Sequence, residues 1–304
     1  MHDRRGMPTT GWTPAPSHGH LGADADPAGG PRPVLLYSPG AGVPRALGTV
    51  QAEDLASHGY IVVSVDAFDT DAVQYPGGRV ALPPIPDPNL SREQLLDLLL
   101  SIRLADTRFV LDRLVDIAAG HDPDVSGTPL PANLTRMMDL SRIGMFGHSL
   151  GGATTVAAMH EDSRIRAGVN LDGPVMGTVA ADGLSQPVVL LGSDVHRRRE
   201  DDPTWQQFRT TGGGLKLQFW LAGSEHSSFT DLQVIAPALV AAGLWKPEDV
   251  QAWGLAGIGT IDPNDSVAVQ RGFLRTFFDA ALDNHTDLAV APEELLHPGL
   301  IPMP

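Results

Sequence analysis

The sequence contains no cysteine. This absence excludes disulfide bonds, thiolate metal ligands and a cysteine nucleophile. Covalent catalysis by this chain would therefore need another nucleophile, and a metal site would need histidine or carboxylate ligands.

Positive charge is also scarce, and lysine occurs only at Lys216 and Lys246. With 21 lysines and arginines against 36 aspartates and glutamates, the formal net charge is −15. A chain of this charge is repelled by polyanions, so we expect no nucleic-acid partner. The preference for arginine over lysine, together with many alanines, glycines and prolines, indicates a bacterial protein from a GC-rich genome.

Long hydrophobic runs are missing as well. Because no apolar stretch reaches roughly 18 residues, the sequence predicts no transmembrane segment. The first residues, MHDRRGMPTTGW, carry two arginines, but no apolar stretch follows them as it would in a signal peptide. We therefore expect a cytoplasmic protein, with secretion as the alternative if a leader was removed.

Composition divides the 304 residues into two parts. Residues 1–31 are rich in glycine, proline, aspartate and histidine without periodicity, and are predicted to form a flexible N-terminal arm. Residues 32–304 are predicted to form a single catalytic domain of the α/β class, for which this length is ordinary.

Within the larger part, short apolar runs alternate with longer amphipathic stretches. The runs are apolar on both faces and are predicted to be buried parallel strands: residues 33–38, 60–68, 142–148, 166–172, 187–194 and 215–223. The predicted helices are residues 45–58, 91–119, 150–160 and 265–284. This alternation predicts a mostly parallel, doubly wound sheet with helices on both faces.

One motif points to nucleophilic catalysis. The segment RIGMFGHSLGG places Gly147-His148-Ser149-Leu150-Gly151 between a predicted strand and a predicted helix. This is the G-x-S-x-G nucleophile elbow of the α/β-hydrolase fold, in which the serine sits on a sharp strand-to-helix turn. The sequence therefore predicts that fold, with Ser149 as the nucleophile.

A loop after the first strand is a candidate for the oxyanion hole. Pro39-Gly40-Ala41-Gly42 follows PVLLYS, and in this fold the loop after that strand supplies one backbone N–H while the residue after the nucleophile supplies another. Glycines let such a loop approach a developing oxyanion closely. We therefore assign Ala41 and Leu150 as the donors.

A serine hydroxyl needs a base, usually a histidine held by a carboxylate. The histidines after Ser149 are His160, His196, His226, His285 and His297. Only His226 lies just beyond the last apolar strand, on the short polar loop GSEHSSF, where the base of this fold belongs. The three arginines that follow His196 indicate instead a solvated loop, so His226 is the predicted base.

Two aspartates are candidates for the acid. Asp172 ends the strand after the elbow helix, and Asp194 ends the next strand. The commonest arrangement in this fold favours the later position, Asp194, but its neighbours HRRRED could pair with it at a solvated surface. An aspartate at a strand end can also simply cap a turn. These patterns alone leave both candidates open.

Four segments of the chain resemble the plasma-type platelet-activating factor acetylhydrolase family and its bacterial esterase relatives. They are DLASHGYIVVSVD, GHSLGGATT, EDSRIRAGVNLDG and LAGSEHSSFTD, and the later GTIDPNDSVAVQRGFLRTFFDAAL is similar too. The resemblance spans residues 33–283. In that family the acid follows the earlier strand and the histidine lies in a G-S-x-H-x-x-F motif, which implies Asp172 and His226 here.

The chain departs from the family pattern in three places. The family's S-H-G-x-G oxyanion loop reads Ser38-Pro39-Gly40-Ala41-Gly42, with proline in place of histidine. Residues 1–31 do not supply the strands that family members carry before this loop. Gly173-Pro174-Val175-Met176 stands where the family tends to have an aromatic residue, so the substrate pocket is expected to differ.

These features predict a serine carboxylic-ester hydrolase that works through an acyl-enzyme on short-chain or platelet-activating-factor-like esters. Such an enzyme needs no metal and no organic cofactor, and its partner is a small-molecule or lipid ester. The alternatives keep the triad for polyester, lactone or peptide hydrolysis or for acyl transfer, since fold does not fix substrate. A third hypothesis is a non-catalytic binding protein of this fold, which an intact Ser149, Asp172 and His226 set argues against.

Overall fold

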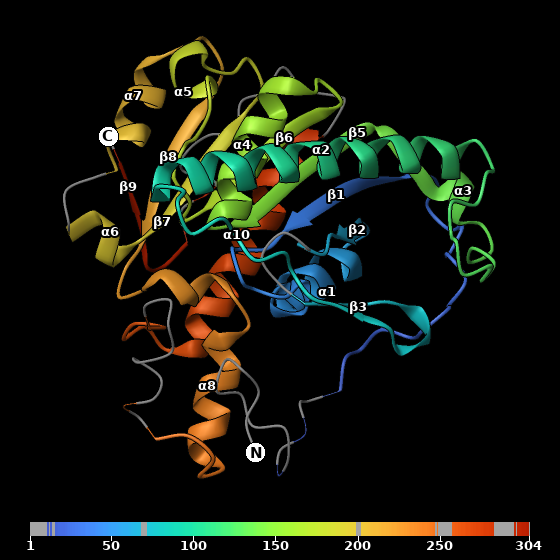
Figure 1. Ribbon diagram of the computed structural model, residues 1–304, viewed down its shortest axis with the longest axis horizontal. Helices are drawn as coiled ribbons and strands as arrows, with labels where there is room; N and C mark the ends of the chain where they lie inside the picture. Colours follow the sequence, from blue (N-terminus) through green and yellow to red (C-terminus); the bar gives the residue numbers. More distant parts are fainter. Residues whose placement is uncertain are drawn as a thin grey trace.

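The computed structural model describes residues 11, 13, 16–67, 72–198, 202–246, 248, 257–282, 295 and 297–303. Its centre is a seven-stranded sheet in the order β2-β1-β5-β6-β7-β8-β9, and β3 and β4 form a separate hairpin (Figure 1). The strands are β1 Arg32–Ser38, β2 Ile61–Ser64, β3 Val73–Gln74, β4 Val80–Ala81, β5 Met138–His148, β6 Ile165–Leu171, β7 Val188–Ser193, β8 Lys216–Leu221 and β9 Leu300–Pro302.

The sheet is parallel from β2 to β8, and only β9 runs antiparallel to its neighbour β8. The predicted mostly parallel sheet is therefore confirmed. Parallel strands end at the same edge of a sheet, and that edge is where ligands bind in open α/β folds. The ends of β1, β5, β6, β7 and β8 consequently bring residues far apart in the chain to one edge.

Helices cover both faces of this sheet. They are η1 Arg45–Gly48, α1 Thr49–Ser57, η2 Pro76–Gly78, α2 Arg92–Ala118, α3 Leu134–Met137, α4 Leu150–Glu161, α5 Val179–Asp182, α6 Asp194–Arg198, α7 Pro203–Thr210, η3 His226–Phe229, α8 Leu232–Ala241 and α10 Pro263–Leu282. Helix α2 packs on α4, and α1 packs on α10. The long α2 runs across the sheet (Figure 1).

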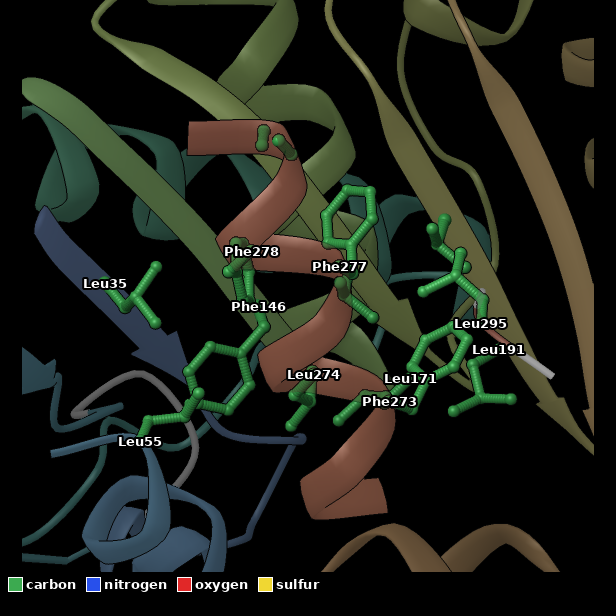
Figure 2. Packing of buried hydrophobic residues seen from close by; sticks show 14 of the residues in the cluster. Leu35, Leu55, Phe146, Leu171, Leu191, Phe273, Leu274, Phe277, Phe278 and Leu295 are labelled. Atoms are coloured by element: carbon green, nitrogen blue, oxygen red, sulfur yellow. The ribbon is translucent and has the colours of Figure 1, made fainter. Parts of the chain in front are cut away.

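Alternation along the strands divides the core into two layers. In β1, Leu35 and Tyr37 point into the layer under α1 and α10, whereas Val34 and Leu36 point into the layer under α2 and α4. Successive side chains of a strand face opposite sides of a sheet, and each of these four is fully buried. Figure 2 shows the first layer, where aromatic side chains of α10 lie against Leu55 and the strands: Phe273, Phe277 and Phe278.

The predicted helix 91–119 corresponds closely to α2. Ser91 caps it, because its hydroxyl accepts the N–H of Gln94 at 3.1 Å while the Gln94 side chain accepts the N–H of Ser91 at 2.9 Å. This is a capping box, which satisfies two N–H groups that have no partner within the helix.

Several short elements were not predicted. They include the hairpin β3–β4, the helices α3, α5, α6, α7 and α8, and the strand β9. Strand β9 is only LIP, and it is a strand because β8 pairs with it. Pairing with a distant partner leaves no periodic pattern in three residues.

Residues 16–31 contain no helix or strand, but they contact the rest of the chain. The N–H of His18 donates to Glu53 at 3.1 Å, and the N–H of Ala25 donates to the carbonyl of Ala132 at 2.9 Å. Strand β1 begins at Arg32, one residue after the predicted arm. Residues 1–10, 12, 14 and 15 of that arm lie outside the described residues.

The segment after η3 is joined to the start of α1 by Asp231. Its N–H donates to the carbonyl of Leu47 at 2.7 Å, and its carboxylate accepts the N–H of Val50 at 3.2 and 3.3 Å. Val50 lies in the first turn of α1, whose N–H groups have no acceptor within the helix, so Asp231 caps α1 from a distant part of the chain. Burial raises the pKa of Asp231 to about 6, against the lowering effect of these N–H groups.

No helix in the described part of the chain combines the length and the apolar character that crossing a membrane requires.

Candidate active site

Ser149 stands at the turn between β5 and α4. Its backbone is strained, with φ 56° and ψ −121°, a combination that a residue with a side chain rarely adopts. Helix α4 starts at the next residue and lies so close to the end of β1 that a Cβ on Gly151 would overlap the carbonyl of Ser38. The glycines of the motif therefore permit a close approach that holds the serine at the edge of the sheet.

His226 contacts both other predicted members of the triad. It lies in the turn after β8, with Nε2 3.0 Å from Ser149 Oγ and Nδ1 2.7 Å from Asp172 Oδ2. A carboxylate only accepts hydrogen bonds, so Nδ1 carries the hydrogen and donates it to Asp172. Nε2 is then free of hydrogen in the neutral ring and accepts the hydroxyl of Ser149.

Of the two candidate acids, the structure places Asp172 beside His226. Asp194 lies instead at the start of α6, where Arg197 Nη2 approaches its carboxylate to 2.7 Å and the N–H of Gly223 donates to it at 3.1 Å. The ion pair with an arginine was predicted, but the solvated surface was not correct, because Asp194 is only 8% exposed.

The Asp172 carboxylate is fully buried and accepts three short hydrogen bonds. Besides His226, the N–H of Ser193 donates to Oδ1 at 2.6 Å, and His196 Nδ1 lies 2.7 Å from the same oxygen. Burial by itself raises the pKa of Asp172, but the hydrogen bonds from His196 and His226 outweigh it and hold the pKa well below its usual range. Asp172 is therefore a carboxylate at any ordinary working pH.

The prediction that His196 lies in a solvated loop is only partly right, because its side chain is partly exposed but does not lie in a loop. It stands on α6, and its side chain is 41% exposed but contacts the buried Asp172 directly. Strand β7 lies next to β6 in the sheet, so the residues after β7 meet the acid that follows β6. The charged run after His196 hid this proximity, and only its position just beyond a strand end could have indicated it.

His148, the residue before the nucleophile, is a second histidine whose role the sequence did not reveal. It is completely buried, and its Nε2 donates to the carbonyl of His226 at 2.9 Å. Burial and the nearby charge of His226 lower the pKa of His148 to about 3, so its ring stays neutral. The hydrogen bond holds the backbone that carries His226. The rings of His148 and His226 also lie 4.5 Å apart.

The loop after β1 is held by a buried arginine. Arg103 of α2 donates from Nη1 to the carbonyl of Pro39 and from Nη2 to the carbonyl of Gly40 at 3.3 Å. The carbonyl of Gly40 also accepts the N–H of Val43 at 3.2 Å. In a trans peptide the N–H points away from the C=O, so these contacts turn the N–H of Ala41 to the opposite side. In the sequence, this contact could have been suspected only because Arg103 is a charged residue at a position of α2 that faces the core.

Ala41 and Leu150, the predicted oxyanion donors, both line a cavity next to Ser149. Leu150 is the first residue of α4, so its N–H has no acceptor within the helix. A Cβ on Gly40 would come within 2.9 Å of His148 Nδ1 and 3.3 Å of Ser149 Cβ, so the loop and the elbow are in close contact.

The cavity has a volume of about 580 Å³. Ser149, Asp172, His196 and His226 reach it from the edge of the sheet. The remaining wall is mostly apolar and aromatic, with two charged residues: Leu96, Gly173, Pro174, Met176, Trp205, Trp220, Arg92 and Asp202. Trp205 and Trp220 are stacked with ring centroids 5.3 Å apart, and Trp205 Nε1 donates to the carbonyl of Gly173 at 2.7 Å.

Among the described residues, no group of three histidine, aspartate or glutamate side chains is arranged to hold a metal ion. The arrangement at the cavity is one of proton transfer: a hydroxyl, an imidazole and a buried carboxylate are joined in a row. Such a row activates a serine for attack on a carbonyl carbon.

Comparison with known proteins finds relatives that are named as esterases or acetylhydrolases. The family model of platelet-activating factor acetylhydrolase, isoform II, matches residues 96–288. A protein of Arthroderma benhamiae named "probable 1-alkyl-2-acetylglycerophosphocholine esterase" is 29% identical over 221 residues, which cover 69% of this chain and 50% of that protein. The platelet-activating factor acetylhydrolase of Cavia porcellus is 28% identical over 214 residues, covering 66% and 48%.

A solved structure agrees with these relatives. The ferulic acid esterase from Streptomyces cinnamoneus superposes with a TM-score of 0.70 and 31% identity, covering 92% of this chain and 76% of that one. The predicted α/β-hydrolase fold is thereby confirmed. The chain spans about half the length of the curated relatives it matches. Because the family model covers most of the chain and the esterase structure covers nearly all of it, the chain belongs to the platelet-activating factor acetylhydrolase, isoform II, family.

Proposed function

We propose that this protein is a serine carboxylic-ester hydrolase whose catalytic triad is Ser149, His226 and Asp172. The observation that carries the proposal is the continuous row of hydrogen bonds at the cavity, 3.0 Å from Ser149 to His226 and 2.7 Å from His226 to Asp172. Ala41 and Leu150 supply the two backbone N–H groups of the oxyanion hole.

The geometry supports an acyl-enzyme mechanism. Ser149 Oγ attacks the ester carbonyl carbon while His226 Nε2 takes its proton, and the carbonyl oxygen becomes an oxyanion that accepts the two N–H groups. The imidazolium, stabilised by Asp172, then gives the proton to the leaving alcohol. Water repeats these steps on the acyl-enzyme, which releases the acid and restores Ser149.

For the substrate we propose short-chain or platelet-activating-factor-like esters, as the names of the curated relatives suggest. A second candidate is an aromatic acyl ester such as a feruloyl ester. The stacked Trp205 and Trp220 at the cavity wall favour it, together with the name of the structural neighbour. Hydrolysis of polyesters, lactones or peptides and acyl transfer would use the same triad and are the further alternatives.

Labelling by a fluorophosphonate probe tests the proposed nucleophile. The purified protein is expected to be labelled at Ser149, and Ser149→Ala is expected to lose both labelling and about 10³-fold or more of kcat. Labelling elsewhere, or a variant as active as wild type, would contradict the assignment.

Rates on p-nitrophenyl esters from acetate to palmitate, and on methyl ferulate, test the substrate proposal. A short acyl chain is expected to be best. An optimum at long chains would contradict this, and a preference for ferulate would favour the second candidate.

We also propose that residues 32–304 form the catalytic domain and that residues 1–31 form an arm outside it. Limited proteolysis is expected to remove the arm first and leave the activity. A cytoplasmic location stays a prediction, which fractionation of the source cells would test.

A further inference from the structure

The buried Asp172 serves two histidines rather than one. His226 approaches Oδ2 at 2.7 Å, and His196 approaches Oδ1 at the same distance. The triad needs only the first of these contacts. The second comes from His196 on α6, the helix that follows β7, and β7 pairs with the strand that precedes the acid. The His196 side chain also lines the cavity.

Both imidazoles donate to this carboxylate, because it has no hydrogen of its own to give. Oδ1 thus receives His196 Nδ1–H and the N–H of Ser193, which leaves Oδ2 directed at His226. Both oxygens are bonded to the same planar carboxylate carbon, so a donor that holds Oδ1 also fixes the orientation of Oδ2. The ring centroids of His196 and His226 lie 6.0 Å apart, so the two rings also interact electrostatically.

Charge balance gives the second histidine a further effect. During acylation His226 becomes an imidazolium, and the single negative charge of Asp172 stabilises it. If His196 is protonated as well, two positive rings share one carboxylate. Among the charged side chains described on α6 and at the cavity wall, Asp194 and Arg197 pair with each other, and Arg92 and Asp202 line the cavity. These four side chains carry two positive and two negative charges, so together they add no net charge near the acid.

We propose that His196 is a positioning residue of the hydrolase: its Nδ1–H holds Asp172 in the orientation that serves His226, and the enzyme works best while His196 is neutral. This inference rests on the proposed function. It assigns to the acid a second partner that acts through Asp172 and not on the substrate.

The proposal predicts how activity falls at acid pH. Protonation of His226 abolishes the base, and protonation of His196 places a second positive charge beside the carboxylate that must stabilise the imidazolium, so each of the two protons lowers the activity. The acid limb of log kcat/KM against pH is therefore expected to be steeper than the slope of about 1 that a lone histidine base gives.

Two substitutions separate the hydrogen bond from the charge. In His196→Asn the amide Nδ2 is the same number of bonds from Cα as Nδ1 of histidine, so it can donate to Asp172 but cannot take a proton. It is expected to keep kcat within about threefold of wild type and to reduce the acid slope to about 1. His196→Ala is expected to lose about tenfold in kcat and to show the same reduced slope, because Asp172 loses a donor.

His160 offers a matched control. It is also a histidine paired with an aspartate, Asp182 at 3.3 Å, but it lies at the end of α4 and does not line the cavity. His160→Ala is expected to keep the wild-type kcat and the wild-type slope. Urea unfolding of each variant checks that a loss of kcat is not a loss of fold.

The outcomes also distinguish this inference from the proposed function. Absence of fluorophosphonate labelling at Ser149 in the wild type would overturn the function itself. Labelling of every variant, with His196→Ala equal to wild type in kcat and in acid slope, would overturn only the role of His196. A His196→Asn variant as impaired as His196→Ala would show that the donated hydrogen bond is not what matters, and would overturn the proposal too.

Discussion

Two buried aspartates in the same domain, Asp172 and Asp231, have pKa values that are shifted in opposite directions. Asp172 accepts three donors at 2.6–2.7 Å, two of them imidazoles, and its pKa falls below the usual range. Asp231 accepts the N–H of Val50 at 3.2 and 3.3 Å, and its pKa rises to about 6. Burial favours the neutral form at both places, so the donors decide the difference.

The comparison explains where each aspartate is useful. A carboxylate surrounded by short, charge-assisted donors stays ionised and can stabilise an imidazolium across the working pH range. A carboxylate with longer backbone donors, such as Asp231, can still cap a helix, but it becomes protonated below about pH 6. The acid of the proposed triad therefore depends on two side chains, from η3 and α6, and on one backbone N–H at the end of β7.

The largest expected effect comes from removing the charge at the first site. Asp172→Asn is expected to lower kcat by about 10³- to 10⁴-fold, because the amide would no longer hold the His226 tautomer or stabilise its imidazolium. Asp194→Asn, which changes the buried aspartate one strand later, is expected to change kcat by less than about tenfold. Both variants would be assayed on one ester under one condition. An inactive Asp194→Asn beside an active Asp172→Asn would reverse the assignment of the acid.

The next largest effect is expected at Arg103, the buried arginine that holds the oxyanion loop. Arg103→Met is expected to lower kcat by about 10²-fold with little change in KM, since the loop that presents the Ala41 N–H loses the contacts on its carbonyls. Arg103→Lys is expected to fall between it and wild type, because lysine cannot bridge two carbonyls as a planar fork does. Kinetics on one ester, with urea unfolding of each variant, measure this.

Arg108→Met is the control for that experiment. Arg108 lies on the same helix, but it is exposed and pairs with Glu161 at 3.0 Å. Its loss is expected to leave kcat unchanged. If Arg103→Met also matched wild type, the loop would not depend on the arginine for its orientation.

The smallest effect is on stability, at the second aspartate. Because the pKa of Asp231 is raised by burial from 3.8 to about 6, the folded protein binds more protons here than the unfolded chain between those values. The contribution of Asp231 to the unfolding free energy is therefore fully present below about pH 4 and is lost as pH rises through 6, by about 3 kcal/mol.

Asp231→Asn removes this titration. Relative to wild type, the variant is expected to gain about 2–3 kcal/mol in unfolding free energy between pH 4 and pH 7, measured by urea unfolding at both pH values. Its kcat is expected to stay within about threefold of wild type, since Asp231 does not line the cavity. Parallel stability profiles for the two proteins would contradict the raised pKa.

Much of the site followed from local patterns. The elbow around Ser149 needs only a strand, a tight glycine turn and a helix, and the segment RIGMFGHSLGG predicted all three. Leu150 came with the elbow, and the position of His226 followed from the last parallel strand. Asp172 was different, because strand order alone favoured Asp194 and only the family resemblance favoured the earlier aspartate.

The sequence by itself determined the fold class, the boundaries of the long helices and the nucleophile, because periodicity and short motifs act over neighbouring residues. Only the tertiary structure decided which side chains surround each buried charge. His196 meets Asp172 because β7 pairs with β6, and Arg103 meets Pro39 and Gly40 because α2 packs on α4, which lies against β1. Such contacts join residues that lie 24 and 63 positions apart, and no local pattern encodes them.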